Sequence, residues 1–164
     1  MINLHTGRVF RNTPNVRFFD LTLEGSNGLD LVEHEGRSVS PPNDELDVPH
    51  WYVHAHQTDN NRVLRGRRLF ELFFPVWEQP HWFVLLTPES GALEIPPGCL
   101  HRSYSGTIGS LLINQAIRTE EYDENAEFKP VPTTRFLLSK LNSPAYHGIT
   151  QYEKDFFIKW GRLP

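Results

Sequence analysis

Hydrophobic and polar positions alternate in short runs along most of the chain. From Trp51 onward, six β-rich runs follow one another at roughly ten-residue spacing: WYVHAH, RVLRG, RLFELFFPVW, HWFVLLT, ALEIPPG and SLLINQAIR. A period of two residues is typical of strands with one buried face. The 13 prolines argue against long helices, because proline breaks helix interiors. The pattern therefore predicts an all-β sandwich or small barrel rather than alternating strands and helices.

The segments on either side of these runs differ in character. The first fifty residues mix short strand-like runs with a turn-rich loop over residues 38–49. After Arg118, the stretches RFLLSKLN and QYEKDFFIKWGRLP predict one or two short amphipathic helices. Their aromatic residues are unusual for a disordered tail. We expect a single domain of 164 residues, with a barrel core over about 51–118 and an extension over about 119–164 that packs against the barrel or a second subunit.

Charge and cysteine content limit the classes of partner and compartment. The formal net charge of −4 and a pI near 6.0 give no reason to expect a nucleic-acid partner. The single cysteine, Cys99, excludes an internal disulfide, fits a reducing compartment and is expected to be a buried thiol. No stretch approaches the roughly 18 apolar residues of a membrane span, and the N-terminus has no leader pattern. We expect a cytoplasmic protein without a membrane partner.

The stretch HAHQTD concentrates candidate chemistry. If it is a strand, Tyr52, His54 and His56 share one face, because side chains two residues apart point the same way. Two imidazoles on one face could bind a divalent transition metal, given a third ligand. The candidate third ligand is His101, which follows the tight turn of GALEIPPGCLH.

These two stretches resemble the two sequence motifs of the cupin superfamily, H-x-H-(x)3,4-E-(x)6-G and G-(x)5-P-x-G-(x)2-H-(x)3-N. Asp59 stands where the family has its glutamate, Gly91 is one residue closer to Pro96 than in the motif, and no asparagine follows His101 at the expected place. The resemblance implies a double-stranded β-helix, or jelly-roll barrel, that pairs into a homodimer. It also implies a divalent ion (Fe, Mn, Ni or Zn) whose ligands are His54, His56, Asp59 and His101.

Other residues are candidates for catalysis or substrate binding. Without a metal, His54 or His56 could act as a base, with Tyr52 or Tyr104 as the acid. Arg65 and Arg102 are candidates for binding an anionic substrate, as is Arg62, although opposite strand parity allows only one of Arg62 and Arg65 to point inward. RVLRG also resembles a segment of the nucleotide-sugar 3,5-epimerases, but two arginines stand where those enzymes continue toward a histidine base.

Three functions remain open at this point. The first is a metal-dependent enzyme, of isomerase or dioxygenase type, that acts on a small anionic or sugar-like molecule. The second is a metal-free isomerase or epimerase of free or nucleotide-linked sugars. The third is a barrel that binds a small molecule or sugar without turnover.

Overall fold

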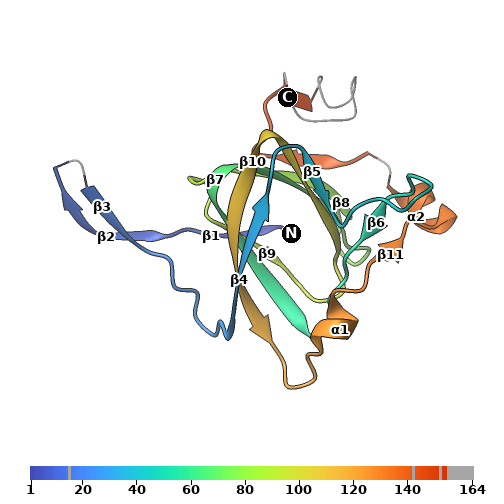
Figure 1. Ribbon diagram of the computed structural model, residues 1–164, viewed down its shortest axis with the longest axis horizontal. Coiled ribbons are helices and arrows are strands. Elements are labelled where there is room, and N and C mark those ends of the chain that lie inside the picture. The colour runs from blue at the N-terminus through green and yellow to red at the C-terminus, as the bar shows by residue number, and fades with distance from the viewer. Residues whose placement is uncertain (15, 142, 152, 155–164) are drawn as a thin grey trace.

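The computed structural model of the chain describes residues 1–14, 16–141, 143–151 and 153–154, and strands make up most of its regular structure (Figure 1). The strands are β1 (Asn3–His5), β2 (Arg8–Thr13), β3 (Val16–Asp20), β4 (Gly28–His34), β5 (Ser38–Ser40), β6 (His50–Trp51), β7 (Gln57–Phe73), β8 (His81–Leu86), β9 (Ala92–Ile95), β10 (Leu100–Arg118), β11 (Val131–Pro132) and β12 (Ala145–His147). The helices are α1 (Glu124–Glu127) and α2 (Arg135–Lys140).

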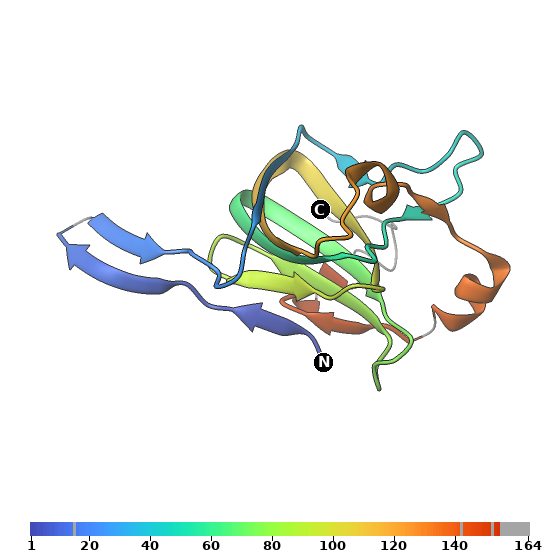
Figure 2. The ribbon, with the colours of Figure 1, turned by 90° about the horizontal axis from the view of Figure 1, so that it is seen from below.

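The long strands β7 and β10 form the centre of an eight-stranded sheet. They pair antiparallel from Gln57 opposite Arg118 to Phe73 opposite Leu100. Strands β9 and β8 flank successive halves of β7, while β4 and β5 flank β10. The strands curl around a common interior, which is visible in both views of the ribbon (Figures 1 and 2).

A bend in both long strands makes this curvature possible. Gly66 and Gly109 have φ values of 74° and 75°, in the left-handed region that favours glycine. A Cβ atom on Gly66 would lie 2.4 Å from the carbonyl oxygen of Gly109, so the two backbones approach too closely for a side chain. The register of the ladder also shifts here, between Ser105 and Ser110. RVLRG and RLFELFF are therefore one bent strand rather than the two that the sequence pattern suggested, and the expected loop over 38–49 begins with β5.

The barrel interior holds an apolar cluster contributed by β7, β8, β9 and β10. Leu72, Val84, Leu86 and Leu93 are completely inaccessible to solvent. Burying a side chain of this size stabilises the fold by about 1.5–3 kcal/mol. The cluster consists of Val63, Phe70, Leu72, Val84, Leu86, Leu93, Ile95, Cys99 and Leu112. Burial raises the pKa of the Cys99 thiol to about 12, in keeping with the buried thiol expected from the sequence.

The C-terminal part of the chain covers the outer wall of the barrel. Strand β11 pairs with β6, and β12 adds to β8 in parallel. Thr134 caps the N-terminus of helix α2, because its hydroxyl accepts a hydrogen bond from the Leu137 amide. Leu137 packs with Trp51 and Phe73. This helix confirms the first amphipathic stretch; most of the second, residues 151–164, lies outside the described residues. No helix in the described ranges is long and apolar enough to cross a membrane.

A polar network fills the interior beside the bend. Arg68, which is 1% exposed, donates hydrogen bonds to Ser110 Oγ (2.6 Å) and His34 Nε2 (3.1 Å). Because Arg68 can only donate, His34 Nε2 must accept, and the proton on Nδ1 is directed at Ser105 Oγ, 2.9 Å away. Burial, and then the charge of Arg68, lower the pKa of His34 to about 4. His34 is therefore neutral in the folded protein at neutral pH.

We expect the free energy of unfolding to fall as the pH drops from 6.5 to about 4. Because the pKa of His34 is lower in the folded state, His34 of the unfolded chain binds a proton at a higher pH than His34 of the folded chain. Protonation therefore stabilises the unfolded state relative to the folded state throughout that interval. Urea unfolding at several pH values across the interval measures the slope. His34→Gln should flatten it, whereas His147→Gln, which changes an exposed histidine, should not. Equal slopes in the two variants would show that the pH dependence originates elsewhere.

Candidate functional site

His54, Asp59 and His101 meet across the barrel interior. Nε2 of His54 and Nε2 of His101 each lie 3.5 Å from Oδ2 of Asp59. All three residues are buried: His54 and Asp59 are each 4% exposed, and His101 is 6% exposed. Asp59 lies near the start of β7 and His101 near the start of β10, whereas His54 precedes β7. The curvature of the sheet brings together positions that are far apart along the chain.

Backbone carbonyl groups orient both imidazoles. His54 Nδ1 lies 2.9 Å from the carbonyl oxygen of Glu127, and His101 Nδ1 lies 3.1 Å from that of Cys99. A carbonyl oxygen can only accept, so each Nδ1 carries a proton and each neutral ring keeps a lone pair on Nε2. Burial lowers the pKa of His101, against the opposing effect of the Asp59 charge. Two nitrogen lone pairs and a carboxylate oxygen thus converge, and this arrangement favours a bound cation, either a proton or a metal ion.

Amide groups hold the second oxygen of the Asp59 carboxylate. Oδ1 accepts hydrogen bonds from Gln57 Nε2 at 2.6 Å and from Asn114 Nδ2 at 2.8 Å. Gln57 Oε1 in turn accepts from Arg118 Nε at 2.7 Å, and Arg118 pairs with Asp30. Hydrogen bonds to an ionised acceptor are roughly twice as strong as neutral ones. They aim Oδ2 of Asp59 at the two imidazoles.

Two aromatic rings flank the histidines. The ring of Tyr52 lies 6.2 Å from that of His54 and 6.1 Å from that of His101, between centroids. The ring of Phe128 lies 5.2 Å from that of His54, between centroids, and Phe128 is 40% exposed. Tyr52 is held beside His101 by two backbone hydrogen bonds of 2.9 Å. Tyr52 is thus the hydroxyl-bearing ring that the fold brings to the histidines.

The carboxylate of Glu127 shapes the segment that carries His54. Glu127 is 3% exposed, and its two oxygens accept hydrogen bonds from the amides of Ala55 (2.7 Å) and His56 (3.0 Å). Its own carbonyl accepts from His54, as described above. These bonds take the place of strand pairing over residues 53–56, which lie outside any strand. The end of α1 is therefore part of the site.

Neither a protein-family model nor a curated protein matches the chain in sequence, but solved structures match its fold. QdtA, a sugar 3,4-ketoisomerase from Thermoanaerobacterium thermosaccharolyticum in complex with TDP, matches with a TM-score of 0.56 at 14% identity, over 85% of this chain and 93% of that one. RmlC, a dTDP-6-deoxy-D-glucose-3,5-epimerase from Legionella pneumophila, matches with 0.59 at 12% identity, over 87% and 82%. A 3,4-ketoisomerase from Helicobacter canadensis matches with 0.55 at 13% identity, over 87% and 97%.

The chain has the cupin fold. This confirms the all-β jelly-roll barrel expected from the two histidine motifs. At these identities the similarity concerns the fold alone.

His56 departs from the cupin pattern that the sequence suggested. The structure groups the side chains of His54, Asp59 and His101, with all three ligand atoms within 4.8 Å of one another, and does not place His56 with them. The His56 ring instead lies beside the Thr119 hydroxyl, with Nδ1 3.4 Å from Oγ1. The expectation that His54 and His56 lie in one strand is wrong: residues 53–56 lie outside any strand, and the amides of Ala55 and His56 donate to the Glu127 carboxylate.

Tyr104 and Arg102 lie on the outer wall of the barrel. Arg102 pairs with Glu71 in the ladder and Tyr104 with Leu69, on the face opposite to His101. The Tyr104 hydroxyl donates to Glu71, and burial followed by the Glu71 charge raises the Tyr104 pKa. Arg102 lies over the rings of Tyr104 and Trp51, at 5.1 Å and 5.8 Å from their centroids. The structure therefore does not bring these two residues to the histidines.

Arg65 is also remote from the interior of the cupin barrel. Its side chain is 68% exposed and forms an ion pair of 2.9 Å with Glu33 on the surface. An exposed pair of this kind contributes about 0–1 kcal/mol. Of the expected acid, base and anion-binding residues, only Tyr52 joins His54, Asp59 and His101.

Sequence reasoning missed Gln57, Asn114, Glu127 and Phe128. Asn114 had a usable signal, because it shares strand parity with the apolar Leu112 and Ala116 in SLLINQAIR. A polar side chain on an apolar face usually has a buried partner. Glu127 and Phe128 had no such signal, since they meet His54 only through the tertiary fold.

Replacing Glu127 with alanine should lower the free energy of unfolding by about 2–4 kcal/mol, because the buried carboxylate that accepts from the part-buried amides of Ala55 and His56 is lost. Glu124→Ala is the matched control, as it removes an exposed glutamate from the same helix. Urea unfolding of both variants measures the difference. Equal stability losses would contradict the role assigned to the Glu127 carboxylate.

Proposed function

We propose that this chain is a nucleotide-sugar isomerase or epimerase that transfers a proton at a carbon beside the keto group of its substrate. The observation that carries the proposal is the convergence of two imidazole Nε2 atoms on one oxygen of the buried Asp59 carboxylate. Similar structures support the substrate class: a QdtA variant is described in complex with TDP-4-keto-6-deoxyglucose. They favour isomerase over dioxygenase chemistry.

The proposed reaction needs a base, a stabilising charge and an acid. His54 or His101 takes a proton through Nε2 from the carbon next to the carbonyl, and the C–H electron pair moves into an enolate. Asp59 stabilises the imidazolium that forms, because it lies 3.5 Å from either nitrogen. The Tyr52 hydroxyl donates a hydrogen bond to the enolate oxygen. For epimerisation, the same carbon takes a proton from solvent on its opposite face, and the proton held by the imidazole is released to solvent. For isomerisation, the hydroxyl proton on the deprotonated carbon passes to the enolate oxygen, the former carbonyl carbon receives the proton from the imidazole, and the carbonyl re-forms on the first carbon.

Solvent-exchange kinetics test the proposal. In D₂O, the wild-type protein should introduce deuterium beside the keto group of TDP-4-keto-6-deoxyglucose, observed by proton NMR. Asp59→Asn should slow this exchange by about 10²- to 10⁴-fold, the usual contribution of acid–base catalysis. Glu45→Gln neutralises an exposed carboxylate by the same change of one atom and should leave the rate unaltered.

The possible outcomes separate the functional classes. Exchange that persists in the presence of a chelator supports proton transfer by the side chains alone. Binding of the nucleotide sugar without exchange by the wild-type protein would contradict the proposal and favour a non-catalytic sugar-binding barrel. Thermal unfolding of Asp59→Asn checks that a lost rate does not reflect a lost fold.

A divalent metal at the same three atoms is the second candidate. The donor set fits: two imidazole nitrogens and one carboxylate oxygen lie within 4.8 Å of one another, and each imidazole anchors its other nitrogen on a carbonyl. Such anchoring is usual for metal-ligating histidines. A bound ion would supply Lewis-acid polarisation of a substrate oxygen. His54, His101 and Asp59 would hold it, whereas His56 and Tyr104 would not.

Metal content distinguishes the two candidates. Untagged protein purified without chelator should hold near-stoichiometric Fe, Mn, Ni or Zn if the metal site is real, and His101→Gln should lose it because one of three ligands is gone. His147→Gln is the control, since it removes an exposed histidine outside the group. Mass spectrometry of the three proteins after reconstitution gives the ratios. No metal in any of them would leave His54, Asp59 and His101 as proton-transfer groups.

The homodimer expected from the sequence is also a proposal. The β2–β3 hairpin supports it, because it projects away from the barrel in both views (Figures 1 and 2). Val9 and Phe10 on this hairpin are 44% and 58% exposed. A second copy of the chain would bury them.

A further inference from the structure

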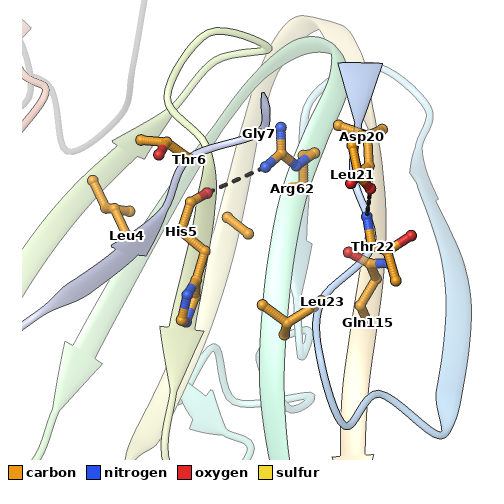
Figure 3. Close-up of a pocket in the computed structure, with 11 residues that line it drawn as sticks. Leu4, His5, Thr6, Gly7, Asp20, Leu21, Thr22, Leu23, Arg62 and Gln115 are labelled. Carbon is orange, nitrogen blue, oxygen red and sulfur yellow. Dashed lines mark hydrogen bonds between the residues drawn. The ribbon is translucent and has the colours of Figure 1, made fainter. Parts of the chain in front are cut away.

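A cavity of about 400 Å³ lies outside the barrel, where the N-terminal segment crosses β7 (Figure 3). Arg62 points into it from the outer face of β7. The neighbouring Asn61 faces the interior, since it pairs with the core residue Leu93. The cavity is therefore on the opposite side of the sheet from Asp59, and it is separate from the histidine site.

The guanidinium of Arg62 has unused hydrogen-bonding capacity. Arg62 is 7% exposed, and its Nε has no hydrogen-bond partner. Nη2 donates to the carbonyl oxygen of His5 at 3.2 Å, the dashed bond in Figure 3. No described carboxylate forms an ion pair with Arg62 within 4.0 Å, although buried charges are normally paired. A buried cation with a free donor is suited to an anionic partner.

The surroundings of the guanidinium leave room for such a partner. Gly7 crosses directly beside Arg62, and a Cβ atom at this position would lie 3.0 Å from Nη1. Polar side chains that line the same cavity are those of Thr6, Thr22 and Gln115. Hydroxyl and amide groups donate hydrogen bonds to anion oxygens without adding charge. The cavity therefore combines a charged donor with neutral donors.

Other charges nearby limit which anion fits. Asp20 lines the cavity, but Arg8 pairs with it at 3.2 Å and the Thr22 amide donates to it. Arg17 and Glu89 line an adjoining cavity that also reaches Arg62. The two acidic and two basic neighbours offset one another, which leaves the charge of Arg62. A small, compact anion matches this balance better than a polyanion.

We infer that the cavity at Arg62 binds a small oxyanion, a phosphate or carboxylate group. The planar guanidinium matches the geometry of both groups, because two of its N–H bonds can meet two oxygens. Nε is free for one of them, while Nη2 keeps its bond to the N-terminal segment. A bound anion would then link β7 to the segment that leads into the β2–β3 hairpin.

Direct observation of the Arg62 Nε–H group tests this inference. In ¹⁵N-arginine-labelled protein, its NMR signal should move saturably as inorganic phosphate or acetate is added at constant ionic strength. Saturation with phosphate would identify a phosphate group as the ligand, and saturation with acetate would identify a carboxylate group. Arg62→Gln should raise the dissociation constant for the anion by about tenfold or more. The increase in unfolding temperature that the same anion produces measures binding to this variant. Arg65→Gln removes the same charge from an exposed position on the same strand and should retain binding.

The outcomes remain distinct even if Arg62→Gln does not fold, because the titration uses the unaltered protein. An Arg62 signal that neither phosphate nor acetate moves would overturn the inference and leave Arg62 as a clamp on the His5 carbonyl. A shift that Arg65→Gln also abolishes would indicate non-specific charge binding. The test does not depend on the sugar reaction, since it follows a residue on the opposite face of β7.

Discussion

The antiparallel pairing of β7 with β10 is the constraint on which the rest of the structure depends. In such a ladder, residues that face each other share one side of the sheet, so the register decides the side chains inside the barrel. It places His101 opposite the core residue Leu72 and Asn114 opposite Asn61. The left-handed glycines Gly66 and Gly109 let both strands bend without ending. The bend carries Asp59 across the interior toward His101.

The polar groups of the interior occupy two regions with an apolar cluster between them. Beside the bend, Arg68 and His34 satisfy each other with the help of serines, and that network is complete. Where the strand ends meet, the histidines and Asp59 present two lone pairs and a carboxylate oxygen to one another. Electrostatic interactions are strong in such a low-dielectric setting. The first arrangement satisfies its polar groups within the barrel, whereas the second brings two imidazole nitrogens and a carboxylate oxygen to within 4.8 Å of one another.

The motifs selected three residues that the structure brings together and placed others elsewhere than the structure does, for identifiable reasons. His54, Asp59 and His101 could be selected because the H-x-H and IPPGCLH stretches couple ligand-type side chains to a strand and a tight turn. His56 was misplaced because local strand parity ignores Glu127, whose carboxylate lies 71 residues further along the chain. Arg102 and Tyr104 were proposed as site residues on chemistry alone, although their ladder partners place them on the outer wall.

The amino-acid sequence by itself determined the class of fold, the strand-rich core and the short helix over Arg135–Lys140, because these follow from local periodicity, turns and caps. Only the tertiary structure decided which imidazoles face Asp59, which side of the barrel each arginine occupies and what closes the site. Those properties depend on contacts between residues far apart in the chain, such as the bond from His54 to the Glu127 carbonyl. A pattern of period two specifies faces within one strand, but it does not specify which faces meet.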